Sequence, residues 1–115
     1  MIDANIDQTN NVTTIIPKRS LESKDRKKLE NLCEEAEFSQ IVIDFKSLDI
    51  LDSTGVGMLF GLQNKIKDKA SVSLVNCNNQ VLEALYIACL HRLFSIPQMD
   101  LKDLSAAKKA KNFSS

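Results

Sequence analysis

Two adjacent hydroxyl side chains, Ser53 and Thr54, lie between an aspartate and a glycine in the stretch Asp52-Ser53-Thr54-Gly55. An apolar run precedes this stretch and a helical pattern follows it, so we expect the hydroxyls to lie at a helix N-terminus. Unpaired backbone N–H groups and the positive end of the helix dipole are found there, and both stabilise an added anion. A serine in this first turn can therefore carry a phosphate without disrupting the helix.

The three glycines of the chain, Gly55, Gly57 and Gly61, all fall in the same helix. A glycine inside a helix costs about 1 kcal/mol relative to alanine, so three of them need a reason. One reason is binding, because Gly55 and Gly57 expose backbone and would let another protein approach closely. A phosphate would add roughly two negative charges and reject such a partner. The alternative is structural: Gly57 and Gly61, four residues apart, could let the helix pack tightly on a sheet.

Other catalytic arrangements find little support in the sequence. The single histidine, His91, would have to meet Ser53 in a Ser-His-Asp site, and nothing in the sequence places them together. We interpret His91 as a helix-capping or surface residue. The sequence contains no G-x-x-x-x-G-K-[ST] or G-x-G-x-x-G loop, no H-E-x-x-H and no paired C-x-x-C. We therefore expect no catalytic residue, no cofactor and no enzymatic activity.

Three carboxylates, Asp44, Asp49 and Asp52, lie near the carboxyl end of one predicted strand, where open α/β sheets place their sites. A Mg²⁺ or phospho-aspartate site there is an alternative hypothesis, although no lysine and threonine occupy supporting positions after later strands. The simpler interpretation makes Asp52 the N-cap of the helix and leaves Asp49 solvated. On that interpretation we predict no metal site.

The composition is that of a soluble globular domain, with 15 basic and 15 acidic residues and a net charge of zero in 115 residues. This balance argues against direct nucleic-acid binding. No segment is apolar enough for membrane insertion, and because the first residues have neither a basic start nor an apolar run, we expect no secretory signal. An odd number of cysteines then suggests reduced thiols in the cytoplasm, and we interpret Cys33, Cys77 and Cys89 as small core residues.

Hydrophobic periodicity predicts an α/β fold in one domain over residues 1–115. The expected strands cover residues 2–8, 12–17, 41–45 and 71–76, with a short edge strand within 93–99. The expected helices cover residues 22–36, 54–68, 79–90 and 101–111, followed by a frayed end. Single helices between strands favour parallel pairing, so only the first hairpin should be antiparallel.

Capping and burial follow from the same pattern. We expect Ser20 or Ser23 to cap the first helix and Asn78 or Asn79 the third. The predicted buried faces of the three helices contain these residues: Leu29, Leu32, Cys33 and Ala36; Val56, Leu59, Leu62, Gln63 and Ile66; Val81, Leu82, Leu85, Tyr86, Ala88 and Cys89. The charged residues of the first helix, Asp25 among them, should face water.

Residues 41–45 (Ile-Val-Ile-Asp-Phe), followed by Leu-Asp-Ile-Leu-Asp-Ser-Thr-Gly-Val-Gly-Met-Leu over residues 48–59, resemble the signature of STAS domains. This family includes the bacterial anti-sigma factor antagonists. The resemblance covers about residues 12–104, leaving 105–115 as the helix end and tail. It implies a mixed sheet of four to five strands with about four helices packed against it.

The resemblance also implies a function. In such antagonists an anti-sigma factor that is also a serine kinase phosphorylates the serine after the aspartate, here Ser53, with Thr54 as second choice. A PP2C-type phosphatase reverses this, and the unphosphorylated form binds the kinase and frees its sigma factor. The implied partner-binding residues are those of the motif together with two from the first loop: Asp52, Ser53, Thr54, Gly55, Val56, Gly57, Leu21 and Glu22.

Two stretches depart from the family pattern. Residues 19–22 lack the usual glycine, and a Ser-Gly-Leu pattern is replaced around residues 89–91. Because the first of these loops contributes to partner binding in the family, the resemblance leaves open the kinase, the pathway and whether a sigma factor is the final target. The sequence also leaves the oligomeric state open. The alternative function is a STAS subunit of a lipid-transporting ABC transporter, acting on its cytoplasmic ATPase without phosphorylation.

Overall fold

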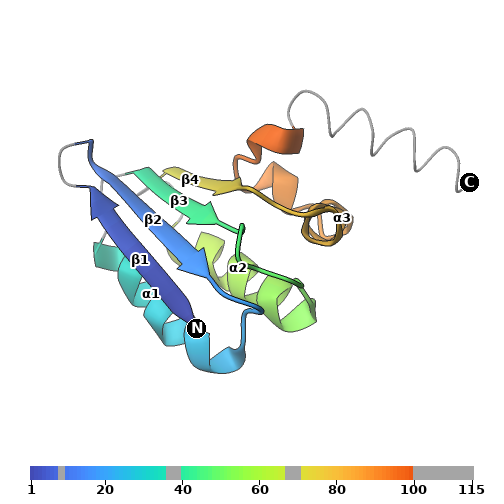
Figure 1. Ribbon diagram of the computed structural model, residues 1–115, viewed down its shortest axis with the longest axis horizontal. Helices are drawn as coiled ribbons and strands as arrows, with labels where there is room; N and C mark the ends of the chain where they lie inside the picture. Colours follow the sequence, from blue (N-terminus) through green and yellow to red (C-terminus); the bar gives the residue numbers. More distant parts are fainter. Residues whose placement is uncertain (8–9, 36–39, 67–70, 100–115) are drawn as a thin grey trace, which may run out of the picture.

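The computed structural model describes residues 1–7, 10–35, 40–66 and 71–99 (Figure 1). The strands in these residues are β1 (Ile2–Asp7), β2 (Val12–Pro17), β3 (Gln40–Asp44) and β4 (Ser71–Val75). The α-helices are α1 (Arg26–Glu35), α2 (Ser53–Ile66) and α3 (Asn79–Ile87), with 3-10 turns η1 (Ser23–Asp25) and η2 (Leu90–Arg92). The predicted α/β fold is confirmed.

The sheet has the order β1-β2-β3-β4. β1 and β2 form an antiparallel hairpin, whereas β2–β3 and β3–β4 are parallel, as the single helices between them predicted. The edge strand expected within residues 93–99 is reduced to one bridge between Ser73 and Ser95. There the Leu74 N–H donates to the Ser95 carbonyl at 2.8 Å.

One face of the sheet is covered by α1 and α2, which lie side by side beneath it, and α3 lies beyond the carboxyl end of β4 (Figure 1). Alternate strand residues point to this face and are buried: Thr13, Ile15, Ile41, Ile43, Val72 and Leu74. The two helices contribute their own buried residues to this core: Leu29 and Cys33 from α1, and Met58, Leu59, Leu62 and Ile66 from α2. This core packs α1 and α2 against one face of the sheet.

The start of the first helical segment differs from the prediction. Neither Ser20 nor Ser23 is the N-cap; Glu22 is, and a 3-10 turn precedes α1. The Asp25 carboxylate turns back and accepts the Glu22 N–H at 3.0 Å. Asp25 is therefore buried, and the expectation that it faces water was wrong because its side chain caps backbone instead.

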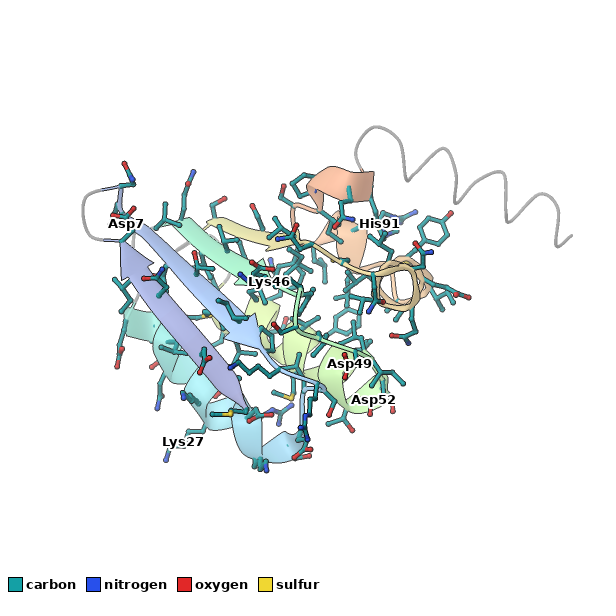
Figure 2. The ribbon with its side chains drawn as sticks, viewed as in Figure 1. Asp7, Lys27, Lys46, Asp49, Asp52 and His91 are labelled. Atoms are coloured by element: carbon teal, nitrogen blue, oxygen red, sulfur yellow. The ribbon has the colours of Figure 1, made fainter. Side chains whose placement is uncertain are left out.

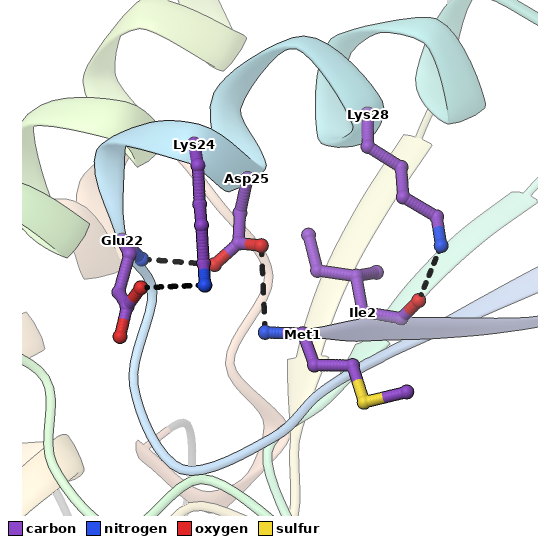
Figure 3. Close-up of polar contacts among 6 residues, drawn as sticks. All are labelled: Met1, Ile2, Glu22, Lys24, Asp25 and Lys28. Carbon is purple, nitrogen blue, oxygen red and sulfur yellow. Dashed lines mark hydrogen bonds and ion pairs between the residues drawn. The ribbon is translucent and has the colours of Figure 1, made fainter.

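Figure 3 shows how this turn is joined to the first strand. The second oxygen of Asp25 lies 3.4 Å from the α-amino group of Met1. Lys28, one turn further along, donates from Nζ to the carbonyl of Ile2 at 2.8 Å. These contacts join the amino end of β1 to η1 and α1. They therefore also hold in place the loop between β2 and η1.

The cysteines divide into two classes. Cys33 and Cys77 are buried, and burial raises the pKa of each thiol to about 12. Both stay protonated and unreactive at neutral pH, as expected of core residues. Cys89 is exposed, so its assignment to the core was wrong. The chain leaves α3 at Ile87, and Cys89 adopts φ 60°, which turns its side chain off the buried helix face.

Helix bounds also differ slightly from the expected ones. α2 begins at Ser53, one residue earlier, and α3 ends at Ile87 instead of residue 90. The predicted helix over residues 101–111, the tail after it and the predicted burial of Ala36 lie outside the described residues. Within the described part of the chain, no helix is long and apolar enough to cross a membrane.

Candidate functional site

The hydroxyl pair lies at the start of α2, as predicted. Asp52 is the N-cap: its Oδ1 accepts the Gly55 N–H at 3.1 Å, and its carbonyl accepts the Val56 N–H at 2.9 Å. Because Asp52 performs the capping, the hydroxyls of Ser53 and Thr54 are not needed for it. Both side chains are exposed. The site therefore presents a free serine hydroxyl at the positive end of a helix dipole.

The loop before α2, residues 47–52, is called here the acceptor loop. Its first side is held by backbone bonds to Arg19, which adopts a left-handed conformation with φ 65°. The Arg19 N–H donates to the Ser47 carbonyl at 2.8 Å, and the Asp49 N–H donates to the Arg19 carbonyl at 2.8 Å. The segment that departs from the family pattern, residues 19–22, thus lies directly against the acceptor loop.

The other side of the acceptor loop is held by the start of α3. Asn78 caps this helix as predicted, because its Oδ1 accepts the Val81 N–H at 2.9 Å. Its Nδ2 donates to the carbonyls of Leu48 and Asp49, at 3.1 and 3.2 Å. Gln80 adds a further pair of bonds to Leu51. The acceptor loop is therefore clamped between two segments distant in sequence.

The glycines of α2 have different roles. A Cβ atom at Gly55 would lie 2.6 Å from Leu51 Cδ1 and 3.4 Å from Leu21 Cβ, so the absence of a side chain there serves internal packing. A Cβ at Gly57 would have nothing within 4 Å, and Gly57 is exposed. A Cβ at Gly61 would make an ordinary contact with the Arg26 guanidinium at 3.7 Å. Close packing on the sheet therefore explains neither Gly57 nor Gly61.

Of the two first-loop residues expected to bind a partner, only one has its side chain on the surface. Glu22 is exposed. Leu21 is 2% exposed and packs beneath the first turn of α2 beside Gly55. Leu21 therefore supports the first turn of α2 from below and does not offer its side chain to a partner. Gly55 is likewise buried and forms part of this support.

Two exposed apolar side chains, one in the acceptor loop and one in α2, were not singled out from the sequence. Phe60 is 38% exposed and Ile50 is 48% exposed. Ser53, Gly57 and Phe60 are spaced four and three residues apart, which places them along one side of α2. This spacing was the available signal. We call Ser53, Gly57 and Phe60 the acceptor face; Ile50 lies in the acceptor loop before it.

The three carboxylates proposed as a metal or phospho-acceptor site do not act together. Asp44, at the end of β3, is buried and accepts hydrogen bonds from the Lys46 N–H at 2.9 Å and Asn76 Nδ2 at 3.1 Å. Asp52 is occupied as the cap of α2, and Figure 2 shows it with Asp49 at the helix start, away from Lys46. The described residues contain no group of three or more His, Cys, Asp or Glu side chains suited to a metal ion.

The histidine is also placed away from the hydroxyls. His91 lies in η2, beyond the end of α3, whereas Asp52 lies at the start of α2 (Figure 2). Its ring stacks on Tyr86 with a centroid separation of 5.1 Å and an interplanar angle of 17°. The geometry does not assemble a Ser-His-Asp site around Ser53, and His91 instead packs against α3.

Comparisons with known proteins identify the family of the chain. A family model described as the STAS domain matches residues 23–103. A comparison of the sequence with curated proteins gives no match.

Several solved structures share the fold. An anti-sigma factor antagonist from Mycobacterium paratuberculosis is 17% identical, with a TM-score of 0.67 over 93% of each chain. The antagonist SpoIIAA in its unphosphorylated form is 17% identical, with a TM-score of 0.65 over 97% of each chain. Bacillus SpoIIAA in its phosphorylated form is 15% identical, with a TM-score of 0.60 over 94% of this chain and 98% of that one.

Proposed function

Because this chain belongs to the STAS domain family, we propose that it is a non-enzymatic regulator of the anti-sigma factor antagonist type, working in the cytoplasm. In this proposal the acceptor face binds a partner that is both an anti-sigma factor and a serine kinase. The partner phosphorylates Ser53 and thereby releases itself, and a PP2C-type phosphatase restores binding. The names of the similar structures, among them SpoIIAA in both phosphorylation states, support this assignment.

The observation that carries the proposal is Gly57. It is exposed, in the interior of α2, with open space where a side chain would be. A glycine that costs helix stability and serves no internal packing is explained if another protein's atoms occupy that space. Ser53 lies one turn before it and the exposed ring of Phe60 one turn after it. A partner seated over Gly57 would therefore cover the serine hydroxyl.

Phosphorylation at Ser53 should change this surface more than it changes the fold. The helix dipole favours a phosphate there, while the neighbouring carboxylate of Asp52 opposes it, so the two effects on stability partly offset each other. On the surface, roughly two negative charges would replace a neutral hydroxyl on the side of α2 that carries Gly57 and Phe60. A partner that buries this region would have to desolvate those charges without a matching cation, and it would be rejected.

Phosphate transfer from ATP should map to Ser53. When the purified protein is incubated with ATP and a lysate of its source cells, we expect mass spectrometry to find the phosphate on Ser53. The Ser53→Ala variant should lose it, and Thr54→Ala should retain it, because only the first hydroxyl matches the motif position. Equal labelling of Ser53→Ala and the unsubstituted protein would show that the acceptor lies elsewhere.

A further inference from the structure

The first turn of α3 holds the acceptor loop through the side-chain amide of Gln80, a contact called here the grip of Gln80. The Leu51 N–H donates to Gln80 Oε1 at 2.8 Å, and Gln80 Nε2 donates to the Leu51 carbonyl at 3.0 Å. Both hydrogen-bonding groups of one loop residue are thus satisfied by one side chain, which fixes the position and the rotation of that segment.

The residue held by Gln80, Leu51, lies two positions before Ser53. Leu51 is 2% exposed, and its side chain sits beneath Gly55 in the first turn of α2. The next residue, Asp52, supplies the cap of that turn, and Ser53 follows it. A shift of Leu51 would therefore move the cap and the serine hydroxyl together.

We propose that Gln80 is a positioning residue for the phosphorylation of Ser53, an inference that rests on the proposed function. Phosphoryl transfer requires the attacking hydroxyl oxygen to be aligned with the leaving group, and a displacement of about 1 Å can cost about 100-fold in rate. Gln80 does not touch the hydroxyl; it acts by holding the acceptor loop. Asn78 assists, because one amide both caps α3 and binds two carbonyls of the loop.

The chain contains a matched control for this grip. Gln98 makes the same pair of bonds to Cys77: the Cys77 N–H donates to Gln98 Oε1 at 2.8 Å, and Gln98 Nε2 donates to the Cys77 carbonyl at 3.1 Å. Replacing either glutamine by methionine keeps the length of the side chain and removes two equivalent hydrogen bonds. Only the change at Gln80 removes hydrogen bonds made directly to the acceptor loop.

The test compares Gln80→Met with Gln98→Met, using the kinase fraction that phosphorylates the unsubstituted protein. We expect Gln80→Met to lower kcat about tenfold and to change KM less than about twofold, because the acceptor face that docks the kinase is retained. Gln98→Met should leave both parameters within about twofold. Amide hydrogen exchange should be faster at Leu51 in Gln80→Met alone, which reports the lost grip.

The outcomes separate this inference from the proposed function. An unchanged kcat in Gln80→Met, or an equal fall in both variants, would overturn the positioning role while leaving Ser53 as the acceptor. Unchanged protection of the Leu51 amide in Gln80→Met would overturn the grip itself. If the unsubstituted protein is not phosphorylated on Ser53, the proposed function fails and the positioning role fails with it.

Discussion

Replacing Gly57 with leucine should weaken the complex with the partner kinase at least about 100-fold while the domain stays folded. A Cβ at this position meets nothing within 4 Å, so the domain itself accommodates a side chain. A partner fitted closely to the bare backbone does not. Gly57→Ala should weaken the complex less and raise the free energy of unfolding by about 1 kcal/mol, because alanine is the better helix former. Titration calorimetry and urea denaturation measure the two effects.

A matched control for this prediction is Asn31→Leu, which places the same exposed side chain on the surface of α1. It should leave the affinity unchanged. The interpretation of Gly57 as an interface residue would be contradicted if Gly57→Leu bound the kinase as tightly as Asn31→Leu does. A loss of stability in Gly57→Ala would contradict the open space at this position.

Replacing Gly55 with valine, two residues before Gly57, should affect the stability of the domain instead of the surface of the acceptor face. We expect it to destabilise the domain by about 3 kcal/mol. The new Cβ would lie 2.6 Å from Leu51 Cδ1 and 3.4 Å from Leu21 Cβ. Both leucines are 2% exposed, so neither can move out of the way into solvent. The measurement is the free energy of unfolding from urea denaturation, relative to the unsubstituted protein.

Gly57→Val is the control for this change, because it introduces the same β-branched residue into the same helix at an open position. The difference between the two variants isolates the packing contact from the helix propensity of valine. If both variants unfold at the same urea concentration, Leu51 must rotate away at little cost, and the structural explanation of Gly55 is wrong.

Much of the fold could be predicted because its signals are local. Alternation in β2 and β4, the apolar run of β3 and the helical spacing of α2 each follow from neighbouring residues, and single helices between strands imply parallel pairing. The cap residues Asp52 and Asn78 were found in the same way. The failures came where a cap or a left-handed residue redirects one side chain, because hydrophobic periodicity shows neither feature. Asp25 is drawn inward by the backbone N–H of Glu22, and Cys89 leaves the helix face because the chain turns left-handed there.

The candidate site was predicted in part for the same reason. The position of Ser53 at a helix start is a property of neighbouring residues, and the sequence indicates it. The grip of Gln80 on Leu51 joins residues 29 positions apart, and no periodicity or motif indicates such a bond. The separate roles of Gly55 and Gly57 depend on what lies opposite each one in space. In the sequence the two glycines are equivalent.

The affinity of the partner kinase for the protein with and without phosphate on Ser53 tests the central claim most directly. The two forms can be prepared by incorporating serine or phosphoserine at position 53 during synthesis and compared by titration calorimetry. We expect the phosphorylated form to bind at least about 100-fold more weakly, with little change in its thermal unfolding midpoint. Equal affinity of the two forms would contradict the switch and would favour a constitutive STAS subunit, such as one bound to the ATPase of an ABC transporter.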